Sequence, residues 1–262
     1  MYSETMLIIL GAIQGVVEWL PISSSGILML LMTQLLGVES FETLNLSIFL
    51  HIGTGAAALV YFNKEAKRIL LRKTEQNLLT YLIVSTIVTG AVGLCLYLLF
   101  NEIDMHGEYL TVLIGFALIF NGIIQKSTHA KNLRDSRSLT CREGILIGLV
   151  QGLSIIPGIS RSGITTSILV FKGFSASEAL RISFLMSIPV IFTSAIGLAL
   201  IRGFSELSFE PMVLTVLVSF VSGIFSIGTL LRVARKVQFW LFCIILGVLA
   251  LTPLLLYGIV DL

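Results

Sequence analysis

Six long apolar stretches constrain the fold of this chain more than any other feature of its sequence. Each is long enough, at about 20 helical residues, to cross roughly 30 Å of hydrocarbon. The stretches are Leu44–Phe62, Leu78–Phe100, Tyr109–Gln125, Ile182–Ile201, Pro211–Leu231 and Phe239–Tyr257. Charged residues make up only 12% of the chain, about half of what a soluble domain carries. The sequence therefore predicts an all-α integral membrane protein with six transmembrane helices.

Two further apolar regions differ from these six because a polar break interrupts each of them. Met6–Leu36 contains Pro21-Ile22-Ser23-Ser24-Ser25-Gly26, and Gly144–Phe171 contains Pro157-Gly158-Ile159-Ser160-Arg161-Ser162-Gly163. Each break leaves arms of roughly 8–15 residues, which are too short to cross the hydrocarbon as single helices. Irregular backbone at membrane depth is tolerated only inside protein or beside a water-filled cavity. Both regions are therefore predicted to be re-entrant helical hairpins.

Positive charge indicates the side from which each hairpin enters. Of the 17 Lys and Arg residues, 15 fall in four segments, and the positive-inside rule places all four on the cytoplasmic face. The segments are 63–77, 125–143, 172–181 and the cluster Arg232, Arg235 and Lys236. Acidic residues gather in the complementary loops, as Glu39, Glu42, Glu102, Asp104, Glu108, Glu206 and Glu210. The second hairpin must then enter and return on the cytoplasmic side, and the first is predicted to dip in from outside, with both termini external.

The two breaks match each other when the chain is shifted by 137 residues. Gly11-Ala12-Ile13-Gln14-Gly15 falls on Gly148-Leu149-Val150-Gln151-Gly152, and Ser23-Ser24-Ser25-Gly26-Ile27 falls on Ser160-Arg161-Ser162-Gly163-Ile164. Opposed hairpins with a shared motif indicate an inverted-topology repeat, which places a binding site between broken helices. We expect one polytopic domain, 1–262, with halves near 1–125 and 144–262 joined by a basic cytoplasmic loop. The alternative is an old duplication whose small residues only allow close helix packing.

Arg161 and Glu18 are the charged residues that this arrangement has to explain. Arg161 is the only basic residue inside a break, and Glu18 is the only acid within a membrane-depth segment. An ionised group near the bilayer centre costs at least ~3 kcal/mol. The guanidinium stands at the start of a helix predicted for Ile164–Phe171, among hydroxyl residues and glycines, namely Ser160, Ser162, Thr165, Gly158 and Gly163. A guanidinium fork, hydroxyls and the N–H groups of a helix start are suited to bind phosphate. The alternative is that Arg161 and Glu18 pair only to lock the hairpins together.

The first break offers groups that could carry out chemistry. Gln14 and Glu18 are four residues apart and share one helix face, and the serines Ser23, Ser24 and Ser25 follow. A carboxylate near a serine and a bound phosphate can act as a general base, or hold a metal or a water. Opposite the phosphate-binding groups around Arg161, this combination predicts a phosphoryl-transfer site. His51, inside one of the predicted spans, is either a proton carrier facing the cavity or a packed, hydrogen-bonded histidine.

Both motifs resemble one known family. Gln14-Gly15-Val16-Val17-Glu18-Trp19-Leu20-Pro21-Ile22-Ser23-Ser24-Ser25-Gly26, with Pro157-Gly158-Ile159-Ser160-Arg161-Ser162-Gly163-Ile164-Thr165, resembles the undecaprenyl-diphosphate phosphatase (bacitracin-resistance) family. The helical layout is similar over essentially the whole chain. The resemblance implies hydrolysis of an isoprenoid diphosphate to its monophosphate, which recycles the lipid carrier of cell-envelope synthesis, at a site open to the external face.

The resemblance also implies roles for single residues. Glu18 would be the catalytic acid or base, with Ser24 ahead of Ser25 as the nucleophile. Arg161 would bind phosphate with the surrounding hydroxyls, and Mg²⁺ or Ca²⁺ would be held by Glu18 and the diphosphate. One departure stands directly after the serine turn, where the family usually has a histidine and this chain has Ile27. Either Glu18, His51 or water takes over proton transfer there, or the enzyme is slower, or the protein no longer hydrolyses anything.

We therefore expect a cell-membrane diphosphatase whose partners are an isoprenoid diphosphate lipid and the bilayer, without nucleic acid. The sequence leaves open whether the chain acts alone or as a homodimer. The alternative is a polyprenyl-phosphate or anion transporter of the same fold, because inverted repeats with broken helices are typical of transporters. A purely structural protein would leave Arg161 and Glu18 unexplained.

Overall fold

The structure, a computed structural model, is mostly helical in the residues that it describes. These residues are 4–35, 37, 40–71, 76–102, 107–128, 134–202, 209–234 and 237–260. The α-helices within them are α1 (Glu4–Val17), α2 (Ser24–Leu30), α3 (Ser40–Tyr61), α4 (Asn63–Leu70), α5 (Gln76–Glu102), α6 (Gly107–Lys126), α7 (Cys141–Gly152), α8 (Arg161–Phe171), α9 (Ala176–Arg202), α10 (Phe209–Ala234) and α11 (Phe239–Val260). A π-helical segment, Leu31–Leu35, continues α2, and short 3-10 segments lie at Ser136–Ser138 and Leu153–Ile155.

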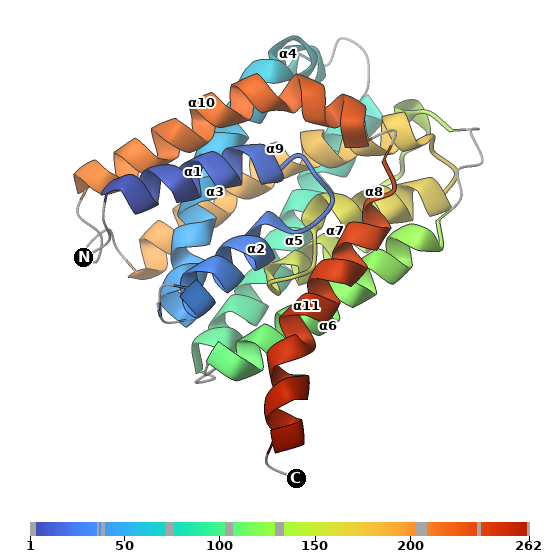
Figure 1. Ribbon diagram of the computed structural model, residues 1–262. Helices are drawn as coiled ribbons and strands as arrows, with labels where there is room; N and C mark the ends of the chain where they lie inside the picture. Colours follow the sequence, from blue (N-terminus) through green and yellow to red (C-terminus); the bar gives the residue numbers. More distant parts are fainter. Residues whose placement is uncertain are drawn as a thin grey trace.

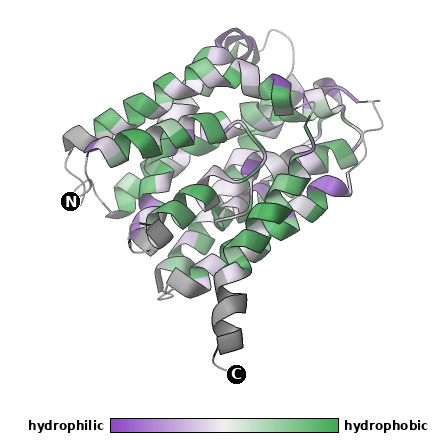
Figure 2. Ribbon diagram, viewed as in Figure 1, coloured by the Kyte–Doolittle hydropathy of each residue, from purple (hydrophilic) through white to green (hydrophobic). Residues whose placement is uncertain are grey.

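Five helices of the described part are long and apolar enough to cross a membrane. They contain the candidate spans Glu42–Tyr61, Asn77–Phe100, Tyr109–Lys126, Ala176–Ile201 and Val213–Val233. These agree with the first five predicted spans. The sixth falls on α11, where the side chains beyond Thr252 lie outside the description. Hydrophobic residues cover most of the helices in Figure 2, and side chains such as Leu200 and Phe225 are about four-fifths exposed. Such a surface is stable in a bilayer, and the chain is a multi-pass membrane protein.

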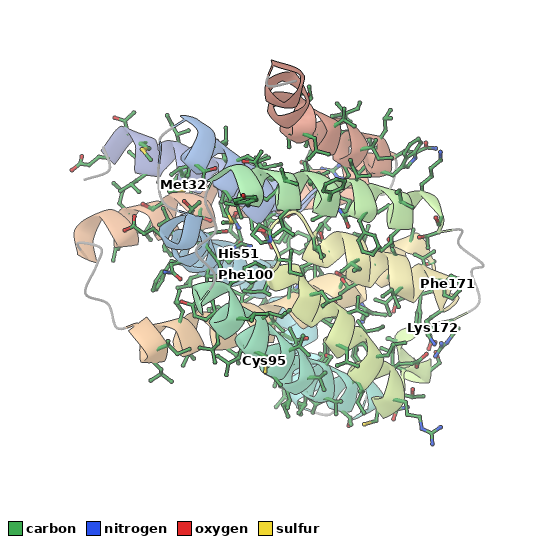
Figure 3. All side chains as sticks on the ribbon, turned by 90° about the horizontal axis from the view of Figure 1, so that it is seen from below. Met32, His51, Cys95, Phe100, Phe171 and Lys172 are labelled. Atoms are coloured by element: carbon green, nitrogen blue, oxygen red, sulfur yellow. The ribbon has the colours of Figure 1, made fainter. Side chains whose placement is uncertain are left out.

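Both predicted interruptions coincide with breaks between helices. The first separates α1 from α2, and the second separates α7 from α8. In Figure 1, α1 runs inward and α2 turns back beside it. Met32, just after α2, and Phe171, at the end of α8, lie toward opposite ends of the molecule in Figure 3. The helices α2 and α8 therefore lead from the centre of the molecule in opposite directions.

Glycines let α1 and α7, the helices that precede the two breaks, each pack closely on a long helix. A Cβ at Gly11 of α1 would lie 2.7 Å from the carbonyl oxygen of Thr215 on α10. A Cβ at Gly148 of α7 would lie 2.8 Å from the carbonyl oxygen of Ser85 on α5. Neither position has room for a side chain, which explains why glycine occurs at this position in both copies of the repeated motif. Small residues serve this close approach between helices in membranes.

Three of the four basic segments meet at one end of the molecule. Arg181 at the start of α9 forms ion pairs with Glu65 of α4 and with Glu178, and it also donates to Ser136 Oγ (3.4 Å). Arg134 pairs with Glu143 at 2.7 Å. The predicted acidic positions and the basic residues of the four segments whose side chains lie outside the description are Glu39, Arg72, Lys73, Glu102, Asp104, Glu108, Lys131, Glu206, Glu210, Arg235 and Lys236.

Candidate functional site

The centre of the molecule is formed where α2 and α8 begin. Ser23 caps α2 by accepting a hydrogen bond from Gly26 N (3.3 Å), and Ser160 caps α8 by accepting one from Gly163 N (3.1 Å). The α8 helix thus begins at Arg161, three residues before the predicted start, because the Ser160 hydroxyl satisfies a free N–H group of the first turn. Ser24 and Arg161 consequently hold equivalent positions, each the first residue of its helix.

Glu18 lies between these two helix starts and contacts both. Its Oε2 accepts hydrogen bonds from Ser24 Oγ (2.6 Å) and Gln14 Nε2 (2.9 Å). Its Oε1 pairs with the Arg161 guanidinium. The side chains of Glu18 and Arg161 are 5% and 13% exposed, so burial strengthens their attraction. The pairing that the sequence left as an alternative is therefore present, and it brings the arginine, the carboxylate and Ser24 into direct contact.

His51 of α3 is the fourth group at this carboxylate. Its Nε2 lies 3.1 Å from Glu18 Oε2, and its Nδ1 lies 2.6 Å from the carbonyl oxygen of Ser47. A carbonyl only accepts, so Nδ1 carries a hydrogen; the contact between Nε2 and the carboxylate needs another hydrogen, on His51 or on Glu18. His51, placed within the body of the molecule in Figure 3, is thus positioned to exchange a proton with Glu18.

A cavity of about 280 Å³ opens beside these groups. The polar part of its wall at the two breaks includes Glu18, Ser23, Ser24, Ser25, His51, Ser160, Arg161 and Ser162. Its remaining walls are mostly apolar and come from α3, α5, α9, the end of α7 and the 3-10 segment Leu153–Ile155. An elongated molecule with an anionic head and a hydrocarbon tail would match both parts.

Four predicted site residues lie behind the cavity wall. Thr165 is fully buried, donates to the Arg161 carbonyl oxygen (2.7 Å) and pairs with Ser183 Oγ (2.6 Å). Gly158, at φ 97°, donates its N–H to Ser23 Oγ (3.2 Å) and so joins the two breaks. Gly163 faces Asn121 of α6, and Gln14 holds the Glu18 carboxylate. These residues shape the site without lining the cavity.

Ile27 also lies away from the cavity. Its side chain packs against the cluster of Ile22, Phe239 and Cys243, on the side of α2 that faces α11. A histidine at this position would enter an apolar cluster. The structure therefore places the imidazole of this site at His51 of α3, as the sequence had left open.

Two positioning residues on α6 were not predicted. Gln125 Nε2 and Asn121 Nδ2 donate to the Pro21 carbonyl oxygen at 2.7 and 3.3 Å. They fix the turn that separates Glu18 from Ser24. The sequence feature that could have identified them is a pair of amides four residues apart in an otherwise apolar span. Polar side chains in such spans usually form hydrogen bonds with neighbouring helices.

The residues present do not form a resident metal site. Within the described chain, no three His, Cys, Asp or Glu side chains are grouped for a metal ion. Among the described residues that line the cavity, Glu18 is the single carboxylate, and both its oxygens are already bonded. Mg²⁺ prefers one or two carboxylates together with substrate phosphates, so a divalent cation would depend on the oxygens of the ligand.

Comparison with known proteins gives consistent matches. The family model described as "Bacitracin resistance protein BacA" matches residues 7–252. A protein of Methanococcoides burtonii named undecaprenyl-diphosphatase is 39% identical, covering 98% of this chain and 100% of the relative. Proteins of the same name from Methanothrix thermoacetophila and Haloarcula marismortui are 40% and 33% identical, over 94% and 92% of this chain and 96% and 93% of the relatives.

Proposed function

Because the chain belongs to the bacitracin resistance protein BacA family, we propose that it hydrolyses an undecaprenyl-type diphosphate to the monophosphate and inorganic phosphate. The observation that carries this proposal is the Glu18 carboxylate, which contacts both the Ser24 hydroxyl and the Arg161 guanidinium. A base, a nucleophile and a phosphate-binding cation are the parts that phosphoryl transfer needs. No relative's name and no described contact favours the transporter alternative.

Arg161 binds the terminal phosphate. Its fork can hold two phosphate oxygens, and the substrate must first displace the carboxylate that occupies the fork in the free protein. Ser160 and Ser162 stand beside it in the cavity wall, with their hydroxyls 3.3 Å apart. Substrate binding thus frees Glu18 from its cation, so that the carboxylate can accept a proton from Ser24.

Ser24 attacks the terminal phosphorus while Glu18 takes its proton. The bond from that phosphorus to the bridging oxygen breaks, and His51 Nε2 donates its hydrogen to the departing lipid monophosphate. Water then attacks the phosphoserine, His51 accepts a proton from the water, and Glu18 returns its proton to Ser24. One water is consumed and all three groups are restored. Ser24 is assigned as nucleophile because Ser23 Oγ already accepts two backbone N–H groups. Among the described contacts, the Ser25 hydroxyl lies 3.4 Å from Ser23 Oγ and not at Glu18, which would have to remove its proton.

A Mg²⁺ or Ca²⁺ ion would be held by the diphosphate and Glu18 and would neutralise phosphate charge. The proton transfers of the reaction run between the protein's own side chains, water and the lipid phosphate. The cavity is built from residues of one chain.

The membrane arrangement that we propose has six spans and two opposed re-entrant hairpins, related as an inverted repeat of about 1–125 and 144–262. The packing supports it: α1 lies on α10 as α7 lies on α5, while α3 contacts α9 and α6 contacts α11. In the inverted repeat, α1, α3, α5 and α6 correspond to α7, α9, α10 and α11. Exchanging these two sets of helices gives the same set of contacting pairs. The positive-inside rule places the basic end in the cytoplasm, and the cavity, which includes Leu44, Tyr97 and Ile201 at the other end, then opens outside.

The test is phosphate release from undecaprenyl diphosphate by the purified protein in detergent. Arg161→Ala should abolish turnover, and Arg161→Lys, which keeps the charge but loses the fork, should retain a small part of it. Absence of phosphate release across pH and divalent cations would refute the proposed activity.

A further inference from the structure

The proposed substrate is too long for the cavity. A volume of about 280 Å³ lies at the lower end of the roughly 300–1,000 Å³ of pockets that hold drug-sized molecules. A diphosphate with its first carbon atoms would fill it. The rest of a polyprenyl tail must therefore leave through a wall of the cavity.

Three helical glycines line a part of the cavity where no side chain occupies the space beside them. At most other helical glycines a Cβ would collide with a neighbouring helix, at 1.9 Å for Gly15, 2.4 Å for Gly53 and 2.6 Å for Gly247. At Gly90 and Gly93 of α5 and at Gly197 of α9, a Cβ would meet nothing within 4 Å. All three line the cavity. Glycines in membrane helices usually allow close packing, but these three leave space open.

The open space lies between α5 and α9 and reaches the outer surface. The two helices are in contact toward the basic end of the molecule, where Tyr81 OH donates a hydrogen bond to Met186 Sδ (3.1 Å). Toward the opposite end, the walls from α5 and α9 are mostly apolar and include Leu94 and Ile201, which are 46% and 45% exposed. Side chains that line the cavity and are also exposed outside indicate a lateral opening to the lipid.

A buried amide, whose oxygen has no hydrogen-bond partner among the described residues, marks the polar end of this opening. Gln151 lines the cavity and is fully buried, and its Nε2 donates to Thr89 Oγ1 (3.2 Å), next to Gly90. Its Oε1 has no hydrogen-bond partner among the described residues. An orphan buried acceptor costs free energy unless a ligand satisfies it, and the hydroxyl of a singly protonated phosphate would do so.

We propose that the groove between α5 and α9, bounded by Gly90, Gly93 and Gly197, carries the first isoprene units of the lipid sideways from the site into the bilayer. The inference rests on the proposed function for the identity of the tail. It assigns to these glycines the selection of long-chain substrates, because they keep the exit open.

Photocrosslinking tests the groove without turnover. The probe is a polyprenyl monophosphate with a diazirine in its second or third isoprene unit, bound to the full chain in liposomes. We expect crosslinks at 90–97 and 193–201 that excess unlabelled polyprenyl phosphate removes. Crosslinks confined to other helices, or spread evenly over every lipid-exposed helix, would overturn the proposal.

Two substitutions test the selection of chain length. Gly93→Leu and Gly197→Leu fill the groove with a residue that favours helices more than glycine does, and Ala91→Leu adds the same bulk to an exposed position of α5 outside the cavity. For the glycine variants, kcat/KM should fall about tenfold or more with undecaprenyl diphosphate but stay within about twofold with a short, soluble isoprenoid diphosphate. Ala91→Leu should leave both unchanged.

The outcomes separate the two proposals. Equal losses on both substrates, or no loss on either, would show that the glycines do not define the exit of the tail. If the unchanged protein releases no phosphate from any isoprenoid diphosphate, the proposed activity fails, and the crosslinks still decide whether the groove holds the lipid.

Discussion

Replacing His51 by glutamine tests the proton transfer that the site geometry supports. Glutamine can still donate a hydrogen bond toward Glu18, but it has no group that titrates. Glu18 would keep its contacts with Ser24, Gln14 and Arg161, so the carboxylate would stay paired and the fold should survive. The variant therefore removes a proton carrier with little change to the surroundings.

The size of the loss in kcat depends on what His51 does at the site. If it contributes only one hydrogen bond to a charged group, its loss is worth about 1.5–3 kcal/mol, or roughly 10–150-fold. If it donates and accepts protons during turnover, the loss in kcat should reach about 10²–10⁴-fold. The two ranges overlap, so a loss of about 10²-fold does not decide between them.

A loss beyond about 150-fold separates the two roles, because it exceeds what one hydrogen bond to a charged group can explain. The loss in kcat of His51→Gln is measured as phosphate release in detergent. A variant within about tenfold of the unchanged protein would refute the proton-carrier role.

Three further results are expected. Ile27→His should not raise kcat, because position 27 packs against Phe239 and Cys243, and it should lower the thermal stability; a clear gain in phosphate release would contradict this placement. Gly148→Leu should reduce the stability of the purified protein by about 3 kcal/mol or more, because its Cβ would lie 2.8 Å from a backbone oxygen, whereas Gly93→Leu should leave the melting temperature nearly unchanged. Arg134, which hydrogen-bonds Glu143, lowers the pKa of that carboxyl, so the pair stabilises the fold at neutral pH and loses its effect as the pH falls through the lowered pKa. Glu143→Gln should therefore lower the free energy of unfolding by about 1 kcal/mol at pH 7 and leave it unchanged in acid. A difference in melting temperature that persists in acid would refute the assignment.

The sequence by itself determined the elements and most of the chemistry. Length and hydropathy of a span are local properties, and a bilayer accepts few alternatives to a helix for an apolar run of this length. The breaks were equally local, because Pro, Gly and Ser clusters end helices wherever they occur. Glu18 and Arg161 could be identified because an isolated charge in an apolar chain needs a partner or a function.

Only the tertiary structure decided which side chains meet. Glu18, His51 and Arg161 are far apart along the chain, and no spacing rule states that α3 turns His51, rather than Leu50 or Ile52, toward the carboxylate. The direction of Ile27 likewise depends on how α2 packs beside α11, and the support of Pro21 by Asn121 and Gln125 depends on the position of α6. Helix packing fixes these rotations through contacts between distant segments, which a one-dimensional pattern does not contain. The same holds for the groove: the sequence contains the glycines of α5 and α9, but only the fold distinguishes those that close a helix contact from those that leave a space.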